Sequence, residues 1–257
     1  MPSVLAIAAH PDDIEFVMSG TMFRLAELGW ETHYFNIANG CCGSMTLDRA
    51  ACARVRLDEA RRAAEILGAR FYSPICDDLS IFYTPELIAK TAAVVRAARP
   101  HIVLTHAPID YMEDHQNASR LAVTAAFIRG MPNCVTDPQQ PVVSHDVAVY
   151  HAQPHGNRLP LGEPVTPTHC VDVTPVMDRK AEMLLAHQSQ SGWLDETQGL
   201  SSYVQTMRDL NAEVGRLGGG AFEFAEGWRK HIHLGFSSRE IDPLAEALGT
   251  ACLVAKR

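Results

Sequence analysis

The first half of the chain alternates between short apolar segments and longer amphipathic ones, and this rhythm constrains the fold more than any other feature. Residues 3–8 are largely apolar, as expected of a strand covered on both faces, and residues 14–28 have the spacing of a helix. The same pair recurs three times, with strands expected at 32–37, 69–75 and 101–105 and helices at 49–67, 85–98 and 114–129. Repeated strand–helix units predict right-handed crossovers. We therefore expect an α/β fold with a Rossmann-like, mostly parallel sheet and helices on both faces, in three αβα layers.

After Gly130 the rhythm loosens. Residues 147–150 and 171–173 predict further strands, residues 175–189, 203–217 and 242–253 predict helices, and residues 153–168 are expected to form a long loop. His231 and His233 alternate as they would on one face of a strand. Neither an internal repeat nor a persuasive linker divides the sequence. We therefore expect a single domain over residues 1–257, with an irregular C-terminal part from about residue 131.

The charge and composition of the chain exclude several classes of partner. A net charge of −8 argues against nucleic-acid binding, which needs clustered Lys and Arg. No stretch approaches the ~20 apolar residues that span a bilayer, and no basic segment precedes the first apolar run, as it would in a signal peptide. Seven cysteines without a CxxC pair favour reduced thiols and a cytoplasmic location. We expect a small-molecule substrate, neither nucleic acid nor membrane insertion, and leave a homo-oligomer open.

The loop after the first expected strand, "AHPDDIE", carries two adjacent carboxylates and an imidazole. In an open parallel sheet, ligands bind beyond the carboxyl ends of the strands. A dinucleotide or phosphate-binding loop would place glycines here, whereas Asp12 and Asp13 would repel phosphate, and neither GxGxxG nor GxxxxGK[ST] occurs. The loop suits a cation better than a nucleotide.

Imidazole and carboxylate are zinc ligands, and catalytic zinc usually has three protein ligands. His10 and Asp13 supply two, and His115, at the start of the helix after the fourth strand, could supply the third. Asp12 is then free to act as a general base, and Asp114 could orient a ligand ring by accepting a hydrogen bond from its N–H group. The competing interpretation is ordinary turn chemistry, in which Asp12 or Asp13 caps the following helix.

At this point the sequence resembles the LmbE-like, or PIG-L-like, zinc-dependent de-N-acetylases. The quoted matches are "AHPDDIEFVMSGT" at 9–21, "RLDEARRAAEILG" at 56–68, the Asp-His pair at 114–115, "DVTPVMDRKAEMLLAHQSQ" at 172–190 and "AEGWR" at 225–229. The resemblance implies that His10, Asp13 and His115 bind zinc and that Asp12 is the general base. It places Arg56 near the substrate or its acetyl group, whereas a surface arginine paired with Glu59 is the plainer alternative.

One position departs from the family pattern P-x-D-x-H-x-D-H, because Met112 stands where the first histidine would be. A thioether cannot donate a proton. Tyr111, His106 or a later histidine such as His155 could take over its role. Asp78, after the third strand, could contact substrate hydroxyls or simply form a loop turn.

The resulting prediction is a zinc-dependent N-deacetylase, an amidohydrolase of linear amides, acting on an N-acetylglucosamine-like or other small polar conjugate. Zinc lowers the pKa of its bound water towards ~7, and Asp12 accepts the proton. Fe²⁺ could occupy the same ligands in a reducing cell. Two alternatives stay open: an amidase for a larger amide conjugate, and a metal- or ligand-binding homologue with impaired catalysis.

Overall fold

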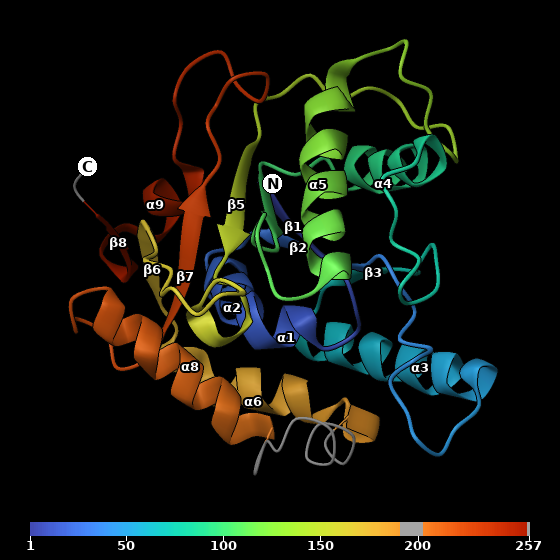
Figure 1. The fold of residues 1–257 in the computed structure, drawn as a ribbon. Coiled ribbons are helices and arrows are strands. Elements are labelled where there is room, and N and C mark those ends of the chain that lie inside the picture. Colours follow the sequence, from blue (N-terminus) through green and yellow to red (C-terminus); the bar gives the residue numbers. More distant parts are fainter. Residues whose placement is uncertain (191–202, 256–257) are drawn as a thin grey trace.

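The computed structural model describes residues 1–190 and 203–255, and its centre is an eight-stranded sheet (Figure 1). The strands run in the spatial order β3-β2-β1-β4-β5-β7-β6-β8. Strands β1 to β5 are mutually parallel, whereas β7 is antiparallel to both of its neighbours and β8 is antiparallel to β6. The expected mostly parallel sheet is confirmed. The strand bounds are β1 Ser3–Ala8, β2 Glu31–Asn36, β3 Arg70–Tyr72, β4 Ile102–Thr105, β5 Ala148–Ala152, β6 His169–Asp172, β7 Ala225–Lys230 and β8 Cys252–Val254.

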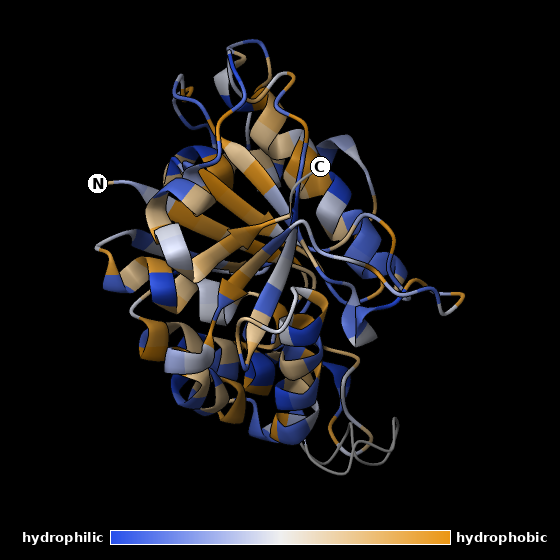
Figure 2. Ribbon diagram, turned by 90° about the vertical axis from the view of Figure 1, so that its left-hand side faces the viewer, coloured by the Kyte–Doolittle hydropathy of each residue, from blue (hydrophilic) through white to orange (hydrophobic). Residues whose placement is uncertain are grey.

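Helices cover both faces of this sheet, as expected. One apolar cluster joins the sheet to α1, α2, α3, α6, α8 and α9, and a second joins its other face to α4 and α5. Figure 2 shows the apolar strands enclosed between the more polar helices. The helix bounds are α1 Asp13–Val17, α2 Ser19–Glu27, α3 Arg49–Leu67, α4 Pro85–Ala98, α5 Glu113–Phe127, α6 Met177–Leu185, α8 Tyr203–Leu217 and α9 Pro243–Leu248.

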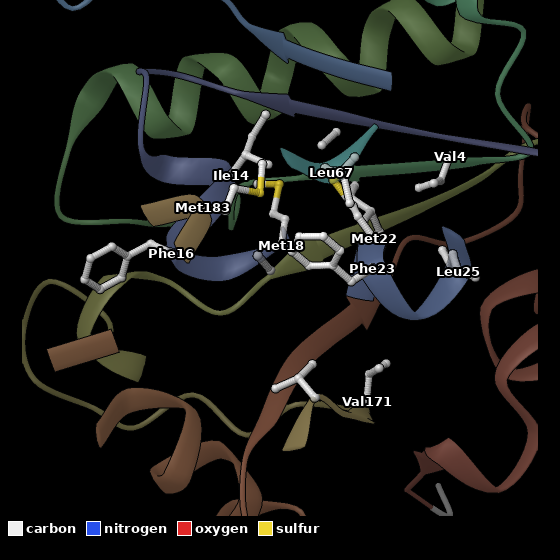
Figure 3. Close-up of a cluster of buried hydrophobic side chains, with 14 of the residues drawn as sticks. Val4, Ile14, Phe16, Met18, Met22, Phe23, Leu25, Leu67, Val171 and Met183 are labelled. Carbon is white, nitrogen blue, oxygen red and sulfur yellow. The ribbon is translucent and has the colours of Figure 1, made fainter. Parts of the chain in front are cut away.

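Strand β1 lies in the middle of the core and contributes side chains to both apolar clusters. Val4 and Ala6 belong to one cluster and Leu5 and Ile7 to the other, and all four side chains are fully buried. Full burial of a large aliphatic side chain contributes ~1.5–3 kcal/mol, so this strand is firmly held. Figure 3 shows the first cluster and, at its edge, Phe16 pointing away from the other labelled side chains.

The expected helix at 14–28 is wrong in one respect, because it is two helices separated at Met18, whose φ is −133°. The carboxylate of Glu226, on β7, accepts hydrogen bonds from the backbone N–H groups of Gly20 (2.9 Å) and Thr21 (2.7 Å). These are N–H groups that the first turn of a helix leaves unpaired. The Glu226 carboxylate at the positively polarised N-terminus of α2 therefore favours the start of a second helix at this point.

Lys180, on α6, completes this buried connection. Its ammonium donates to the carbonyl of Phe16 (2.9 Å) and to Glu226, and both charged side chains are buried. The α1–α2 junction is thus tied to two elements from the second half of the chain. Within residues 1–190 and 203–255, no helix is long and apolar enough to cross a membrane.

The C-terminal part departs furthest from expectation. His231 and His233 do not form a strand, because β7 ends at Lys230. The helix expected at 242–253 ends at Leu248, and the chain then forms β8. Strand β7 itself was not predicted. Its sequence, "AEGWRK", does not show apolar alternation, because a charged residue, Glu226, occupies one of its buried positions.

Candidate functional site

The candidate site lies at the carboxyl ends of β1 and β4, which are adjacent in the sheet. The loop "AHPDD" leaves β1 and enters α1, whereas the loop after β4 leads into α5. In Figure 1 the lower end of α5 lies beside α1. Two polar segments separated by about a hundred residues in sequence are therefore adjacent in space, as predicted from the parallel topology.

The structure brings His10, Asp13 and His115 together, with one ligand atom from each lying within 4.8 Å of the others. Nδ1 of His10 lies 3.5 Å from Oδ2 of Asp13, and Nε2 of His115 lies 3.4 Å from Oδ1 of the same carboxylate. Ligand atoms at ~2.0–2.2 Å from a tetrahedral ion would be ~3.3–3.6 Å apart. The donor types and their spacing both fit a zinc-like cation.

Each of the two histidines is oriented by a further carboxylate. Nε2 of His10 lies 2.9 Å from Oδ2 of Asp114, and Nδ1 of His115 lies 3.0 Å from Oδ1 of Asp110. Such contacts fix the ring and leave the other nitrogen, Nδ1 of His10 or Nε2 of His115, for a metal. Burial lowers the pKa of both rings, but the neighbouring carboxylates outweigh it and raise the pKa to about 9 for His10 and about 10 for His115.

Asp110 was not assigned a role from the sequence, although its position in the P-x-D motif was visible. Asp114 was expected to hold a ring, and it contacts the ring of His10. Its Oδ2 also accepts the backbone N–H of Leu79 at 2.7 Å. Asp114 touches no free space in the pocket described below, so its geometry matches an orienting group.

Asp12 and Asp13 are adjacent, yet they face different partners. The backbone of Asp12 has φ 100°, in the left-handed region that non-glycine residues rarely adopt. Oδ2 of Asp12 lies 3.2 Å from the guanidinium of Arg56 and accepts a hydrogen bond from the hydroxyl of Tyr203 at 2.7 Å. Burial raises the pKa of Asp12, whereas the neighbouring histidines, above all the charged His115, outweigh burial and hold the pKa of Asp13 well below its usual range.

A pocket of about 70 Å³ opens over these groups. Its size suits a small substituent rather than a large ligand. Four of its lining residues were not identified as site residues from the sequence: Phe16, Val17, Gln153 and Tyr203. Gln153 and Tyr203 come from the second half of the chain, where no motif marks them. The lining residues are Asp12, Asp13, Phe16, Val17, His106, Tyr111, His115, Gln153, His155 and Tyr203.

The three residues considered as substitutes for the missing family histidine all line this pocket. Nε2 of His106 accepts the backbone N–H of Ala9 at 3.0 Å and lies 3.3 Å from Oδ2 of Asp13. Burial lowers the pKa of His106 and of His155, so both are neutral near pH 7. Tyr111 is 54% exposed at the mouth, and its ring lies 5.7 Å from that of His155.

Two other residues expected at the site have different surroundings. Arg56 is buried and bonds Asp12 and the carbonyl of Pro11, so it is not a surface arginine paired with Glu59. Asp78 is not among the described residues that line the pocket; its carboxylate accepts the N–H groups of Gly40 and Cys42. Asp78 thus forms the loop contact that was the alternative to substrate binding, and direct substrate contact stays a prediction for both residues.

Comparison with known proteins confirms the family resemblance. Residues 5–126 match the PIG-L family, described as GlcNAc-PI de-N-acetylase. A diacetylchitobiose deacetylase of Thermococcus kodakarensis is 29% identical, over 73% of this chain and 69% of that protein. A 4-oxalmesaconate hydratase of Pseudomonas putida is 28% identical, over 69% of this chain and 70% of that protein. The solved structure of the N,N'-diacetylchitobiose deacetylase of Pyrococcus horikoshii has a TM-score of 0.75 at 22% identity, covering 94% of this chain and 88% of that one.

Proposed function

From the premise that residues 5–126 carry the PIG-L family domain, we propose that the protein is a metal-dependent hydrolase that removes an acetyl group from an amide nitrogen. An N-acetylglucosamine-like sugar or another small polar amide is the proposed substrate. The single observation that carries the proposal is the convergence of His10, Asp13 and His115 beside the carboxylate of Asp12. Relatives named as deacetylases support the choice of reaction.

The proposed metal is zinc, held by His10, Asp13 and His115. Two imidazoles and one carboxylate form a common catalytic zinc set, and Fe²⁺ accepts the same donors. When bound, the ion would lower the pKa of a coordinated water and polarise the substrate carbonyl. Asp114 and Asp110 would keep the two rings aligned by holding the proton on the nitrogen that faces away from the ion.

Asp12 is the proposed general base. It lines the pocket next to Asp13, and its Oδ1 has no hydrogen-bond partner among the described residues. Asp12 therefore takes the proton of the attacking water. His106, whose neutral ring lines the pocket beside Asp13, is the proposed donor to the carbonyl oxygen as negative charge develops on it.

Tyr111 and His155 are proposed to contact the substrate at the pocket mouth. Together with Phe16 they form a chain of ring contacts, with centroids 5.4 Å apart for Phe16 and His155 and 5.7 Å apart for Tyr111 and His155. Sugar rings and other amphipathic groups pack well against such walls. The pocket that these rings line has a volume of about 70 Å³, which suits an acetyl group, so larger acyl chains should be poor substrates.

The experiment that tests this proposal is a substrate panel with the zinc-loaded protein, in which free amine and acetate are both measured. Asp12→Asn should retain zinc and lose more than about 100-fold in kcat, because asparagine tolerates the left-handed backbone but cannot accept a proton. Asp178→Asn is the matched control, since Asp178 is almost fully exposed, and it should keep full activity. Full activity of Asp12→Asn would refute the assignment of the base.

A second candidate reaction is the addition of water to a carbon–carbon double bond. It is favoured by one observation: the relatives include a hydratase that is 28% identical to this chain, against 29% for the deacetylase. The same base and metal could activate water for either acceptor. The panel should therefore include unsaturated carboxylates, larger amide conjugates and N-acetyl sugars. Turnover of an unsaturated acid with no amine release would replace the proposed reaction, and zinc binding without any turnover would favour a catalytically impaired homologue.

A further inference from the structure

The hydroxyl of Tyr203 reaches the general base from a part of the chain that the family match does not cover. Tyr203 is the first residue of α8 and is 191 positions from Asp12 in sequence, yet its hydroxyl donates to Oδ2 of Asp12 at 2.7 Å. Its ring lies against Phe16, with centroids 5.1 Å apart, and its side chain lines the pocket. The contact is therefore inside the site rather than near it.

The same oxygen of Asp12 has a second partner. The guanidinium of Arg56 lies 3.2 Å from Oδ2, and its own position is fixed by the carbonyl of Pro11. Arg56 and Tyr203 are 4% and 5% exposed, so neither can readily exchange its partner for water. Two buried donors on one oxygen restrain rotation of the carboxylate and leave the other oxygen, Oδ1, for the reaction.

We propose that Tyr203 is a positioning residue for catalysis, holding the Asp12 carboxylate jointly with Arg56 so that Oδ1 faces the metal site. This inference rests on the proposed function of Asp12 as the base. A buried tyrosine hydroxyl needs a polar partner, and here that partner is the group whose orientation decides proton transfer. Because a displacement of about 1 Å in a catalytic group can lower a rate about 100-fold, removal of the hydroxyl should lower kcat.

The test compares Tyr203→Phe with Tyr150→Phe. Tyr150 makes an equivalent bond, 2.7 Å from its hydroxyl to Asp242, in a buried region outside the site, so it controls for the loss of a buried tyrosine–aspartate bond. Both variants should unfold at a lower temperature. Only Tyr203→Phe should lose about 10-fold or more in kcat, with KM and bound zinc unchanged. Equal kcat for Tyr203→Phe and wild type would overturn the proposal.

A readout that does not depend on turnover separates this inference from the proposed reaction. In crystals of the zinc-loaded wild type, Oδ2 of Asp12 should stay within hydrogen-bond distance of the Tyr203 hydroxyl, with Oδ1 towards the metal. In crystals of Tyr203→Phe the carboxylate should be rotated or disordered. A carboxylate that stays in place without the hydroxyl, or a wild-type Oδ2 bound to zinc, would overturn the proposal even if the enzyme hydrolyses amides. If Tyr203→Phe does not fold, the wild-type crystals alone decide.

If no amide substrate is found, the deacetylase proposal fails while the crystals still decide whether Tyr203 holds Asp12. Tyr203→His adds a check by rescue, since an imidazole N–H can donate to the same oxygen. Higher kcat for Tyr203→His than for Tyr203→Phe supports a donor role. The reverse order would contradict it.

Discussion

Replacement of Lys180 by methionine should destabilise the protein strongly, because it leaves a buried carboxylate without its counter-charge. The side chains of Lys180 and Glu226 are 0% and 1% exposed. In the variant, Glu226 keeps its two bonds from the α2 backbone but loses the ammonium. Removal of one partner of a buried ion pair costs ~3–5 kcal/mol. That loss is a large fraction of the ~5–15 kcal/mol by which a domain is stable.

Urea unfolding of Lys180→Met, Glu226→Gln and the double variant measures this effect as a double-mutant cycle. The double variant should lose less than the sum of the single variants, because it no longer buries an unpaired charge. Lys90→Met is the matched control: Lys90 pairs with Glu86 at 2.7 Å on the surface, where such pairs contribute ~0.5 kcal/mol or less. A loss below ~1 kcal/mol for Lys180→Met, or strict additivity in the cycle, would refute the reasoning.

Two further predictions concern pH and packing. Burial lowers the pKa of His151 to about 4 from its ordinary 6.5, so as the pH falls below 6.5 the unfolded chain takes up a proton that the folded protein excludes. The free energy of unfolding should therefore fall by ~3 kcal/mol between pH 6.5 and pH 4 on account of this residue. In urea unfolding, the free energy of His151→Gln should fall less steeply with decreasing pH than that of the wild type. Parallel pH dependences of the two proteins would count against this prediction. Gly20→Ala should lower the melting temperature, at a cost of ~1–3 kcal/mol, because the added Cβ would lie 2.6 Å from Cγ1 of Val173 and 2.9 Å from Oε1 of Glu226. An unchanged or higher melting temperature would contradict this.

The first half of the fold was predictable because its elements carry strong local signals. The helix expected at 85–98 has the same bounds as α4. Its start was recognisable because Thr84 caps the helix by accepting the N–H of Leu87 and Pro85 occupies the first helical position. The buried run at 3–8 is β1. By contrast, β7 contains a buried Glu226, whose charge is paired with Lys180, 46 positions away, and whose oxygens accept N–H groups of α2. A local sequence pattern cannot reveal an ion pair between two residues that far apart in the chain.

The candidate site was likewise predictable only in part. The convergence of His10, Asp13 and His115 could be expected on the condition that the first and fourth strands are neighbours, because the loops after parallel strands lie at one edge of the sheet. The residues of the pocket wall could not be predicted in this way. Tyr203 and Gln153 reach it through the packing of α8 and the end of β5, and neither has a chemical signature in the sequence. For Arg56 the sequence indicated proximity to the site, and the structure adds that its guanidinium faces Asp12.

Within the pocket, the proposed metal-binding residues and part of the wall come from different halves of the chain. The three residues proposed to bind the metal and Asp12 lie within residues 5–126, whereas Gln153, His155 and Tyr203 lie beyond them. Changes at Gln153 or His155 could therefore alter the pocket wall without touching the residues proposed to bind the metal, whereas a change at Tyr203 would also remove a hydrogen bond to Asp12. Chimaeras joined near residue 130 offer a way to retarget the enzyme, provided that Lys180 and Glu226 travel together in the transplanted half.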